Sequence, residues 1–318
     1  MHIRAKVKQR LRMKKDNEIG LAPQPSKLFG TSDTVVRAVL NQLEEVKCPL
    51  CHVAPLPFAV DYQGFQLCSC PSCGLQFLSP RPVVEQLTEN VYNETYFAET
   101  ETADESKSAD RYQFARQLAN LLRLRKERRG TILDVGCGDG SFLRYARYEG
   151  WQVAGTDIRL ASGARKMNCP LWEGQLPLID FNEVRFDVIR FNHVLEHTQN
   201  PLLELAAARK LLAPGGIIFI SVPNIAGLSA RLKNAQSRLH LKQKRWRHYA
   251  ALHHLWFFSP ETLTKLVEQA GLSVLYWETP VWKKSHQSSF LEQVYRKLLE
   301  GSRAASILDF YCAARRQG

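Results

Sequence analysis

The chain has 318 residues, 45% of them hydrophobic and 23% charged, and its 43 Lys and Arg against 31 Asp and Glu give a formal net charge of +12. This length and composition predict a globular protein with one large domain and an appendage, or two domains, and exclude collagen-like, low-complexity and wholly disordered chains. The longest apolar run, Ile217–Val222, is too short to span a bilayer, and no apolar run follows the basic N-terminus as in a secretory signal, so we expect a cytoplasmic protein.

The positive charge is concentrated in two stretches that contain no acidic residue, Met1–Lys15 and Arg231–Arg247, with seven Lys or Arg each. The rest of the chain is therefore close to neutral. An excess of this kind indicates an anionic partner such as a phosphate, a nucleic acid or a membrane surface, or else only a solvated tail and a solvated helix face. We assign residues 1–40 to a basic N-terminal tail.

Four of the eight cysteines form two C-x2-C pairs with eighteen residues between them, Cys48 with Cys51 and Cys70 with Cys73. Each pair directs two sulfurs at one point, and two pairs complete the tetrahedron of a structural zinc site. Disulfides are the alternative, which the lack of a secretory signal disfavours, while Cys68 and His52 are rival ligands. A segment this short has too little core to fold without a metal, so we predict a zinc-ribbon-like module over residues 41–82.

After a polar connector over residues 83–115, the pattern changes to short β-rich runs that alternate with helical stretches. Such alternation predicts a parallel sheet covered by helices, which makes residues 116–318 an α/β domain. The β-rich runs are Thr131–Val135, Gln152–Thr156, Phe186–Phe191 and Gly216–Val222.

The first of these runs leads into a glycine-rich loop, Asp134-Val-Gly136-Cys-Gly138-Asp-Gly140. Glycines let the backbone approach a ligand closely at the carboxyl edge of a sheet. Asp157 ends the next strand, twenty-one residues after Gly136, where an acid is well placed to bind a ribose diol. No Gly-Lys-Ser/Thr follows the loop, which excludes a phosphate-binding P-loop.

This loop, together with the acid after the second strand, resembles the class I S-adenosylmethionine-dependent methyltransferases. The similarity covers roughly residues 45–318, and five ordered elements are far more specific than a glycine loop alone. With the N-terminal cysteine pairs, the chain is similar to a bacterial subgroup of these enzymes. The later segments that carry the resemblance are Phe186–Ile189, Val194–His197 with Pro201, Leu211–Ile217 and His254–Pro260.

The resemblance implies a Rossmann-like sheet of seven strands whose final pair, Ser273–Glu278 and Ser306–Cys312, is antiparallel. It also implies that S-adenosylmethionine is the cofactor. Asp157 would then bind the ribose hydroxyls, Ile158 would pack on the adenine, and Glu173–Gln175 is the best candidate for a further adenine contact. The other implied contacts, with the methionine moiety and the sulfonium side, are Asp134, Gly136, Cys137, Gly138, Gly140, Asn192 and His193.

The candidate catalytic residues are His193, Glu196, His197 and His254. A hydroxyl acceptor must lose its proton to a base, or bind a metal that acidifies it. We expect His193 and His197 to share one helical face at i, i+4 spacing. Some quinone-ring and RNA-ribose O-methyltransferases of this fold hold a divalent metal with E-x-x-E-H, and here His193 replaces the first Glu. A metal site, a general base at His197 and a packing or capping histidine all remain open, and His254 either points into the acceptor pocket or packs at the sheet edge.

The segment 225–252 contains the second basic stretch, and we expect it to cover the acceptor site and determine specificity. Its Arg and Lys favour a small or glycan-linked, anionic acceptor that is methylated on oxygen or carbon. One alternative is an RNA methyltransferase that binds RNA through the zinc ribbon and the basic segments, and another is a non-catalytic methyltransferase-like binding module. Asn192–Leu195 lacks the Pro-Pro-aromatic motif of the amino-base methyltransferases, so we do not expect N-methylation of a nucleobase.

Overall fold

The structure is a computed structural model that describes residues 33–92, 107–281 and 290–315. Most of the predicted basic tail, residues 1–40, lies outside the described residues, and its last part forms helix α3 (Asp33–Leu40). None of the described helices combines the length and the apolar character needed to cross a bilayer. The cytoplasmic location stays a prediction.

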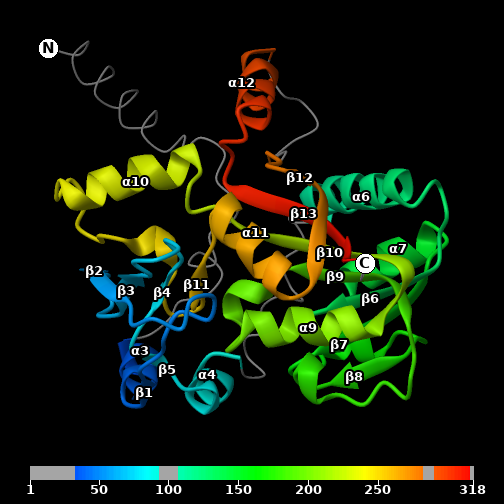
Figure 1. Ribbon diagram of the computed structural model, residues 1–318, viewed down its shortest axis with the longest axis horizontal. Coiled ribbons are helices and arrows are strands. Elements are labelled where there is room, and N and C mark those ends of the chain that lie inside the picture. The colour runs from blue at the N-terminus through cyan, green and yellow to red at the C-terminus, as the bar shows by residue number, and fades with distance from the viewer. Residues whose placement is uncertain (1–32, 93–106, 282–289, 316–318) are drawn as a thin grey trace, which may run out of the picture.

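A seven-stranded sheet with strand order β12-β13-β10-β9-β6-β7-β8 forms the centre of the larger domain (Figure 1). The strands β6 to β10 run parallel, whereas β13 is antiparallel to both β10 and β12. This order confirms the predicted α/β, Rossmann-like fold class with its antiparallel final pair. The strands are β6 (Thr131–Val135), β7 (Gln152–Asp157), β8 (Leu171–Glu173), β9 (Phe186–Asn192), β10 (Leu212–Pro223), β12 (Leu272–Glu278) and β13 (Ile307–Ala314).

Helices bury both faces of this sheet, which explains why its strands are almost continuously apolar. Leu133 packs in one cluster with Leu205 of α9 and Leu266 of α11, the two helices in front of the sheet in Figure 1. Its neighbour Ile132 packs in a second cluster with Phe142 of α7 and with α6, because successive strand residues face opposite layers. The helices are α6 (Lys107–Leu124), α7 (Ser141–Tyr148), α8 (Ser162–Arg165), α9 (Pro201–Leu211), α11 (Pro260–Gln269) and α12 (Phe290–Gly301).

Two of these helices begin with side-chain caps that the sequence encodes locally. The Asn200 side chain accepts hydrogen bonds from the Leu202 and Leu203 amides at the start of α9. Ser259 and Thr262 form a reciprocal capping box at the start of α11. Each cap satisfies amides that the first helical turn leaves without a partner. Both helices therefore start at defined positions relative to the sheet.

The cysteine-containing module is a separate sheet of four short strands in the order β11-β4-β3-β2. Its β3 and β4 lie on either side of the second cysteine pair. The edge strand β11 comes from far along the chain, where Trp256 pairs with Phe77 and the Leu78 amide donates to the Leu255 carbonyl at 3.1 Å. The remaining elements include α4 (Val84–Asn90), and the strands are β1 (Leu43–Glu44), β2 (Leu56–Val60), β3 (Gln66–Ser69), β4 (Gln76–Leu78), β5 (Arg81–Pro82) and β11 (Trp256–Phe257).

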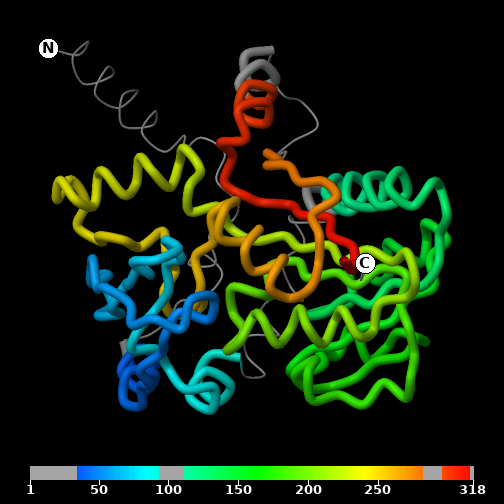
Figure 2. The backbone as a smooth tube through the Cα atoms, viewed as in Figure 1, coloured from blue at the N-terminus to red at the C-terminus, as the bar shows by residue number. Residues whose placement is uncertain are grey.

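The segment 225–252 forms helix α10 (Leu228–Arg238) and then returns along the cysteine module, as the yellow part of the trace in Figure 2 shows. Trp246 and Tyr249 are buried, and their ring centroids lie 5.9 and 6.1 Å from that of Phe58. The Tyr249 hydroxyl donates to Oε1 of Gln76 at 2.8 Å. The aromatic side chains of this segment therefore pack on the module sheet.

Candidate active site and cysteine cluster

A cavity of about 990 Å³ opens at the carboxyl ends of β6, β7 and β9. Ligands of open α/β folds bind at this edge, because the strand order reverses there and the loops diverge. The predicted cofactor residues that line the cavity are Asp134, Gly136, Cys137, Gly138, Asp157, Ile158, Asn192 and His193. Gly140 ends the loop as the residue before α7.

The glycine loop requires its glycines for two different reasons. Gly136, Gly138 and Gly140 all have positive φ angles, of 71°, 53° and 80°, which side chains other than glycine adopt at a cost. A Cβ atom at Gly136 would lie 2.5 Å from Cγ2 of Val194, whereas one at Gly138 would meet nothing within 4 Å. Gly136 therefore allows close packing under the loop, and Gly138 leaves room beside its backbone for a ligand.

Asp157 lies at the end of β7 directly beside this loop. Its Oδ2 accepts a hydrogen bond from the Gly138 amide at 2.9 Å. Burial raises the pKa of Asp157 to about 6, although that hydrogen bond and two further backbone amides oppose the rise. A carboxylate held in this way can accept hydrogen bonds from a diol, and the position fits the ribose contact that the resemblance implies.

Asp134 is part of a buried polar network that sequence reasoning missed. Its Oδ1 pairs with Nη1 of Arg190 at 2.6 Å, and both side chains are at most 4% exposed. Nε of Arg190 donates to Gln117 at 3.1 Å, and Gln117 donates to Oδ1 of Asn192 at 3.0 Å. The network holds Asn192 at the cavity wall. An arginine within the apolar strand β9 was the signal that could have revealed it.

The candidate adenine contact Glu173–Gln175 is only partly supported by the geometry. The Glu173 side chain is 46% exposed and pairs with Arg165 at 2.5 Å. Gly174, Gln175 and Leu176 line the cavity instead. Of the segment 173–175, Gln175 is therefore the polar side chain at the cavity wall.

His193, Glu196 and His197 meet, but not on one helical face as expected. His193 has a φ of 56°, and only Leu195–His197 forms a short 3-10 helix, η3. The reason is a tertiary contact, because the His193 amide donates to the Ser221 carbonyl of β10 at 2.8 Å and turns the chain. Oε1 of Glu196 lies 3.2 Å from Nδ1 of His193 and 4.0 Å from Nε2 of His197.

The orientation of His197 is determined by a backbone carbonyl. Its Nδ1 lies 2.7 Å from the His253 carbonyl oxygen, which can only accept, so Nδ1 carries the proton and Nε2 has a free lone pair. The Tyr92 hydroxyl donates to the same carbonyl at 3.2 Å. Burial lowers the pKa of His197, against the opposing charge of Glu196. His197 and His193 line the cavity.

His254 lies next to His197, and the centroids of the two imidazole rings are 4.9 Å apart. One ligand atom each from Glu196, His197 and His254 lies within 4.8 Å of the others. Glu196 is fully buried, and its Oε2 has no hydrogen-bond partner among the described residues. A carboxylate oxygen without a partner beside two imidazoles is a donor set that suits a divalent cation.

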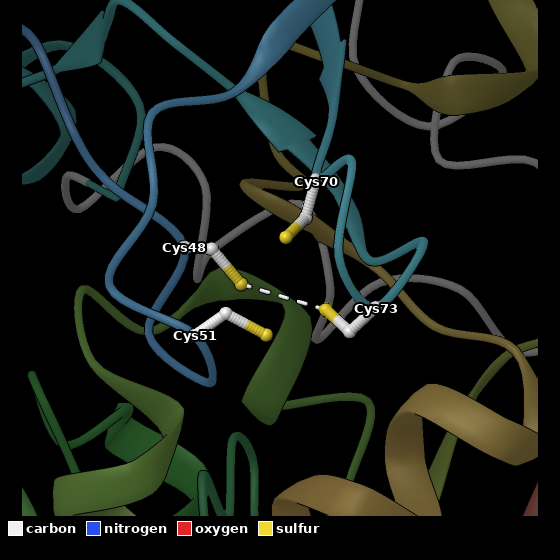
Figure 3. A group of neighbouring side chains, drawn as sticks. All are labelled: Cys48, Cys51, Cys70 and Cys73. Carbon is white, nitrogen blue, oxygen red and sulfur yellow. Dashed lines mark hydrogen bonds between the residues drawn. The ribbon is translucent and has the colours of Figure 1, made fainter.

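The cysteine pairs come together as predicted. Cys48, Cys51, Cys70 and Cys73 direct their sulfurs at a common centre (Figure 3), within 4.8 Å of one another. The sulfurs of Cys48 and Cys73 are 3.6 Å apart, close to the edge of about 3.8 Å that four Zn–S bonds of 2.3 Å would give a tetrahedron. The rival Cys68 donates to the Ser79 carbonyl instead, outside the cluster.

The basic segment 225–252, which we expected to cover the acceptor site, packs on the cysteine module. The structure describes all of its residues, and none of them lines the cavity. Its buried Trp246 and Tyr249 hold it on the cysteine module through their contacts with Phe58, because aromatic side chains bury a large apolar surface. The helices that line the cavity are α4, α6, α7 and the start of α9.

Comparison with known protein families identifies the larger domain. The model of a methyltransferase domain family matches residues 107–276, more than half of the chain. The matched region starts where α6 starts, before the predicted domain boundary at residue 116.

Curated relatives agree with this match over part of their length. The ubiquinone biosynthesis O-methyltransferase of Dinoroseobacter shibae is 31% identical over 164 residues, which cover 44% of this chain and 59% of that protein. The enzyme of the same name from Histophilus somni is 31% identical over 127 residues, or 36% and 51% of the two chains. The chain thus spans between half and three fifths of the length of these relatives.

A solved structure supports the fold. The 1,6-didemethyltoxoflavin-N1-methyltransferase of Burkholderia thailandensis, solved with bound 1,6-didemethyltoxoflavin and S-adenosylhomocysteine, superimposes with a TM-score of 0.52. The match covers 82% of this chain and 99% of that chain at 16% sequence identity.

Proposed function

The chain belongs to the methyltransferase domain family and is a class I S-adenosylmethionine-dependent methyltransferase; on this premise we propose that it methylates a hydroxyl oxygen of a small-molecule acceptor. The observation that carries the proposal is the free Nε2 of His197, a proton acceptor at the wall of the cofactor cavity. The names of the curated relatives, which are O-methyltransferases, support oxygen as the methylated atom.

The residues at the strand ends fit the cofactor. S-adenosylmethionine, when bound, supplies an electrophilic methyl group that needs no further activation by the protein. Gly138 and its neighbours would leave backbone space for the methionine moiety, Asp157 would accept hydrogen bonds from the ribose hydroxyls, and Ile158 would offer apolar surface to the adenine. Asn192, held by Gln117, faces the same cavity.

Transfer to oxygen requires removal of a proton from the acceptor. Nε2 of His197 takes that proton, while the His253 carbonyl keeps the ring in the tautomer that can accept it. Glu196 lies 4.0 Å from this nitrogen and stabilises the positive charge that forms on the ring. His193 shares the carboxylate of Glu196 and is a positioning residue in this scheme.

A specific observation favours a second way to activate the hydroxyl. The donor set of Glu196, His197 and His254 fits a divalent cation, which would lower the pKa of a bound acceptor hydroxyl. Metal analysis of the purified enzyme and assay after chelation separate the two mechanisms. Activity that survives complete removal of divalent metal assigns the step to the base alone.

We also propose that the four-cysteine cluster holds one structural zinc ion. The metal would fix the module sheet, which continues through Leu78 to Leu255. The Leu255 amide in turn donates to the Glu196 carbonyl at 2.7 Å. Zinc would thus support the position of η3 in the active site through two main-chain hydrogen bonds.

The sequence left three alternatives to a small-molecule acceptor: a non-catalytic module, an RNA acceptor and a glycan-linked acceptor. The chain is an enzyme, which corrects the reading as a non-catalytic module. The glycan-linked acceptor rested on the basic segment 225–252, and the RNA acceptor rested on the zinc ribbon together with both basic segments. No residue of segment 225–252 lines the cavity, and the names of the curated relatives support neither acceptor. A small-molecule acceptor is the proposal that remains.

The test combines cofactor binding with transfer. Calorimetry with S-adenosylmethionine should show one site, which Asp157→Ala weakens. Incubation of a fractionated metabolite extract with labelled cofactor, followed by mass spectrometry, should show a methyl ether that His197→Gln does not form. A labelled product that is an N-methyl compound or an RNA would contradict the proposal.

A further inference from the structure

The start of helix α9 places an acid in the wall of the active-site cavity. Glu204 lies in the first turn of α9 and lines the cavity, yet the residue is only 7% exposed. Thr198 and Gln199, just before the helix, line the same cavity. The Asn200 cap holds this turn in place, so the carboxylate has a defined position.

Glu204 differs from every other described acid of the cavity wall. Asp134 pairs with Arg190, Asp139 pairs with Arg144, and Asp157 accepts from the Gly138 amide. No hydrogen bond or ion pair reaches the Glu204 carboxylate from the residues that the structure describes. Burial alone raises the pKa of Glu204 to about 7, which agrees with a carboxyl group that no cation or donor of the protein approaches.

A first-turn glutamate has an ordinary structural explanation, which the same chain lets us test. Negative side chains near a helix N-terminus are stabilised by the helix dipole. Glu261 occupies the first turn of α11 in this way and is exposed to solvent. Burial removes the water that normally solvates a carboxylate, and the dipole compensates only part of that loss. Among the residues that the structure describes, Glu204 therefore has no hydrogen-bond or ion-pair partner, and a ligand in the cavity can provide one.

The surroundings indicate what this partner is. The side of the cavity formed by α4 contributes Val84, Leu87 and Thr88, which are uncharged. The arginines of the lining come from α6, α7 and β9, and two of them are already engaged by Asp134 and Asp139. A group that donates a hydrogen bond or carries a positive charge satisfies Glu204, whereas an anionic group meets a like charge.

We propose that Glu204 binds the methyl acceptor, through a hydroxyl or a protonated amine that donates to its carboxylate. The inference rests on the proposed function. It narrows the substrate class to acceptors whose group next to Glu204 is neutral or cationic. It replaces the anionic acceptor expected from the basic segment, since that segment does not line the cavity. Glu204 is then a specificity-determining residue, separate from the proton-accepting His197.

The experiment uses three aromatic probes that differ in one group. The full-length protein, saturated with S-adenosylhomocysteine, is titrated by calorimetry with benzylamine, benzyl alcohol and benzoate at pH 8, where Glu204 is ionised. We expect benzylamine and benzyl alcohol to bind and benzoate to bind at least tenfold more weakly than benzylamine. Much tighter binding of the amine would indicate a protonated amine in the natural acceptor, and equal binding would indicate a hydroxyl.

Two matched variants show which carboxylate is responsible. Glu204→Gln should lower the affinity for benzylamine at least tenfold and reduce the difference in affinity between benzylamine and benzoate. The affinity for S-adenosylhomocysteine should stay unchanged. Glu261→Gln, the exposed first-turn counterpart, should change none of these values. The inference is overturned if Glu204→Gln binds the three probes with the same relative affinities as the wild-type protein. It is also overturned if the wild-type protein with bound S-adenosylhomocysteine binds benzoate more tightly than the other probes, or binds none of the three. Failure of the wild-type protein to bind S-adenosylhomocysteine would count against the proposed function instead.

Discussion

Replacement of Arg190 by Met should destabilise the protein far more than loss of an ordinary surface ion pair. The guanidinium lies 2.6 Å from the Asp134 carboxylate, both side chains are at most 4% exposed, and its Cζ lies 3.8 Å from the Phe142 ring centroid. Met fills much of the same volume but leaves Asp134 buried without its cation. Breaking one side of a buried pair costs about 3–5 kcal/mol in the free energy of unfolding.

The matched control is Arg144→Met. Arg144 pairs with Asp139 at 2.9 Å, but the two side chains are 49% and 29% exposed, and solvent-exposed pairs contribute about 0–1 kcal/mol. Urea denaturation followed by circular dichroism measures both variants, and the comparison uses the difference between their free energies of unfolding. The affinity for S-adenosylmethionine should fall with Arg190→Met as well, because Gln117, which donates to Asn192 at the cavity wall, loses its hydrogen bond from Arg190.

A second substitution tests the cause of the loss. In the Arg190→Met background, Asp134→Asn removes the charge that was left without compensation, so part of the lost stability should return. An Arg190→Met variant that is no less stable than Arg144→Met would refute the reasoning. Failure of Asp134→Asn to restore stability would show that packing against Phe142, not charge, is what Arg190 provides.

Three further outcomes test other parts of the site. The purified protein should contain one zinc per chain, and Cys51→Ser should lose most of it by mass spectrometry of the metal content, since three thiolates do not close the tetrahedron; an unchanged metal content would disprove the ribbon. Affinity for S-adenosylmethionine should fall as the pH drops below about 6, because burial raises the pKa of Asp157 to about 6 and its carboxylate must be ionised to accept hydrogen bonds from the ribose. In Asp157→Asn, the affinity measured by calorimetry should not depend on pH in this range. An unchanged pH dependence in this variant would assign the effect to another group. His197→Gln should lower kcat by a factor of about 10²–10⁴ without a change in cofactor affinity. If this variant keeps the wild-type kcat in a transfer assay, His197 is not the general base.

The features predicted correctly from the sequence depend on residues that are close together along the chain. The strand, loop and helix around Gly136 are encoded within about a dozen residues, and each C-x2-C turn needs only four. The alternation of apolar strands and helices likewise reports a sheet buried on both faces. Most of the residues predicted to bind the cofactor line one cavity, because parallel strands bring their carboxyl ends to one edge; their contacts with a cofactor stay a prediction.

The sequence alone therefore determined the fold class, the glycine loop and the four cysteines, while the tertiary structure decided what surrounds them. His193 is not helical because its amide donates a hydrogen bond to β10. The strand β11 pairs with β4 of the cysteine module although the two lie far apart in the sequence. The partner of Arg190 and the isolation of Glu204 are equally nonlocal. Burial, pairing and the position of a charged segment depend on contacts between distant residues, and the local pattern of a sequence carries no record of them.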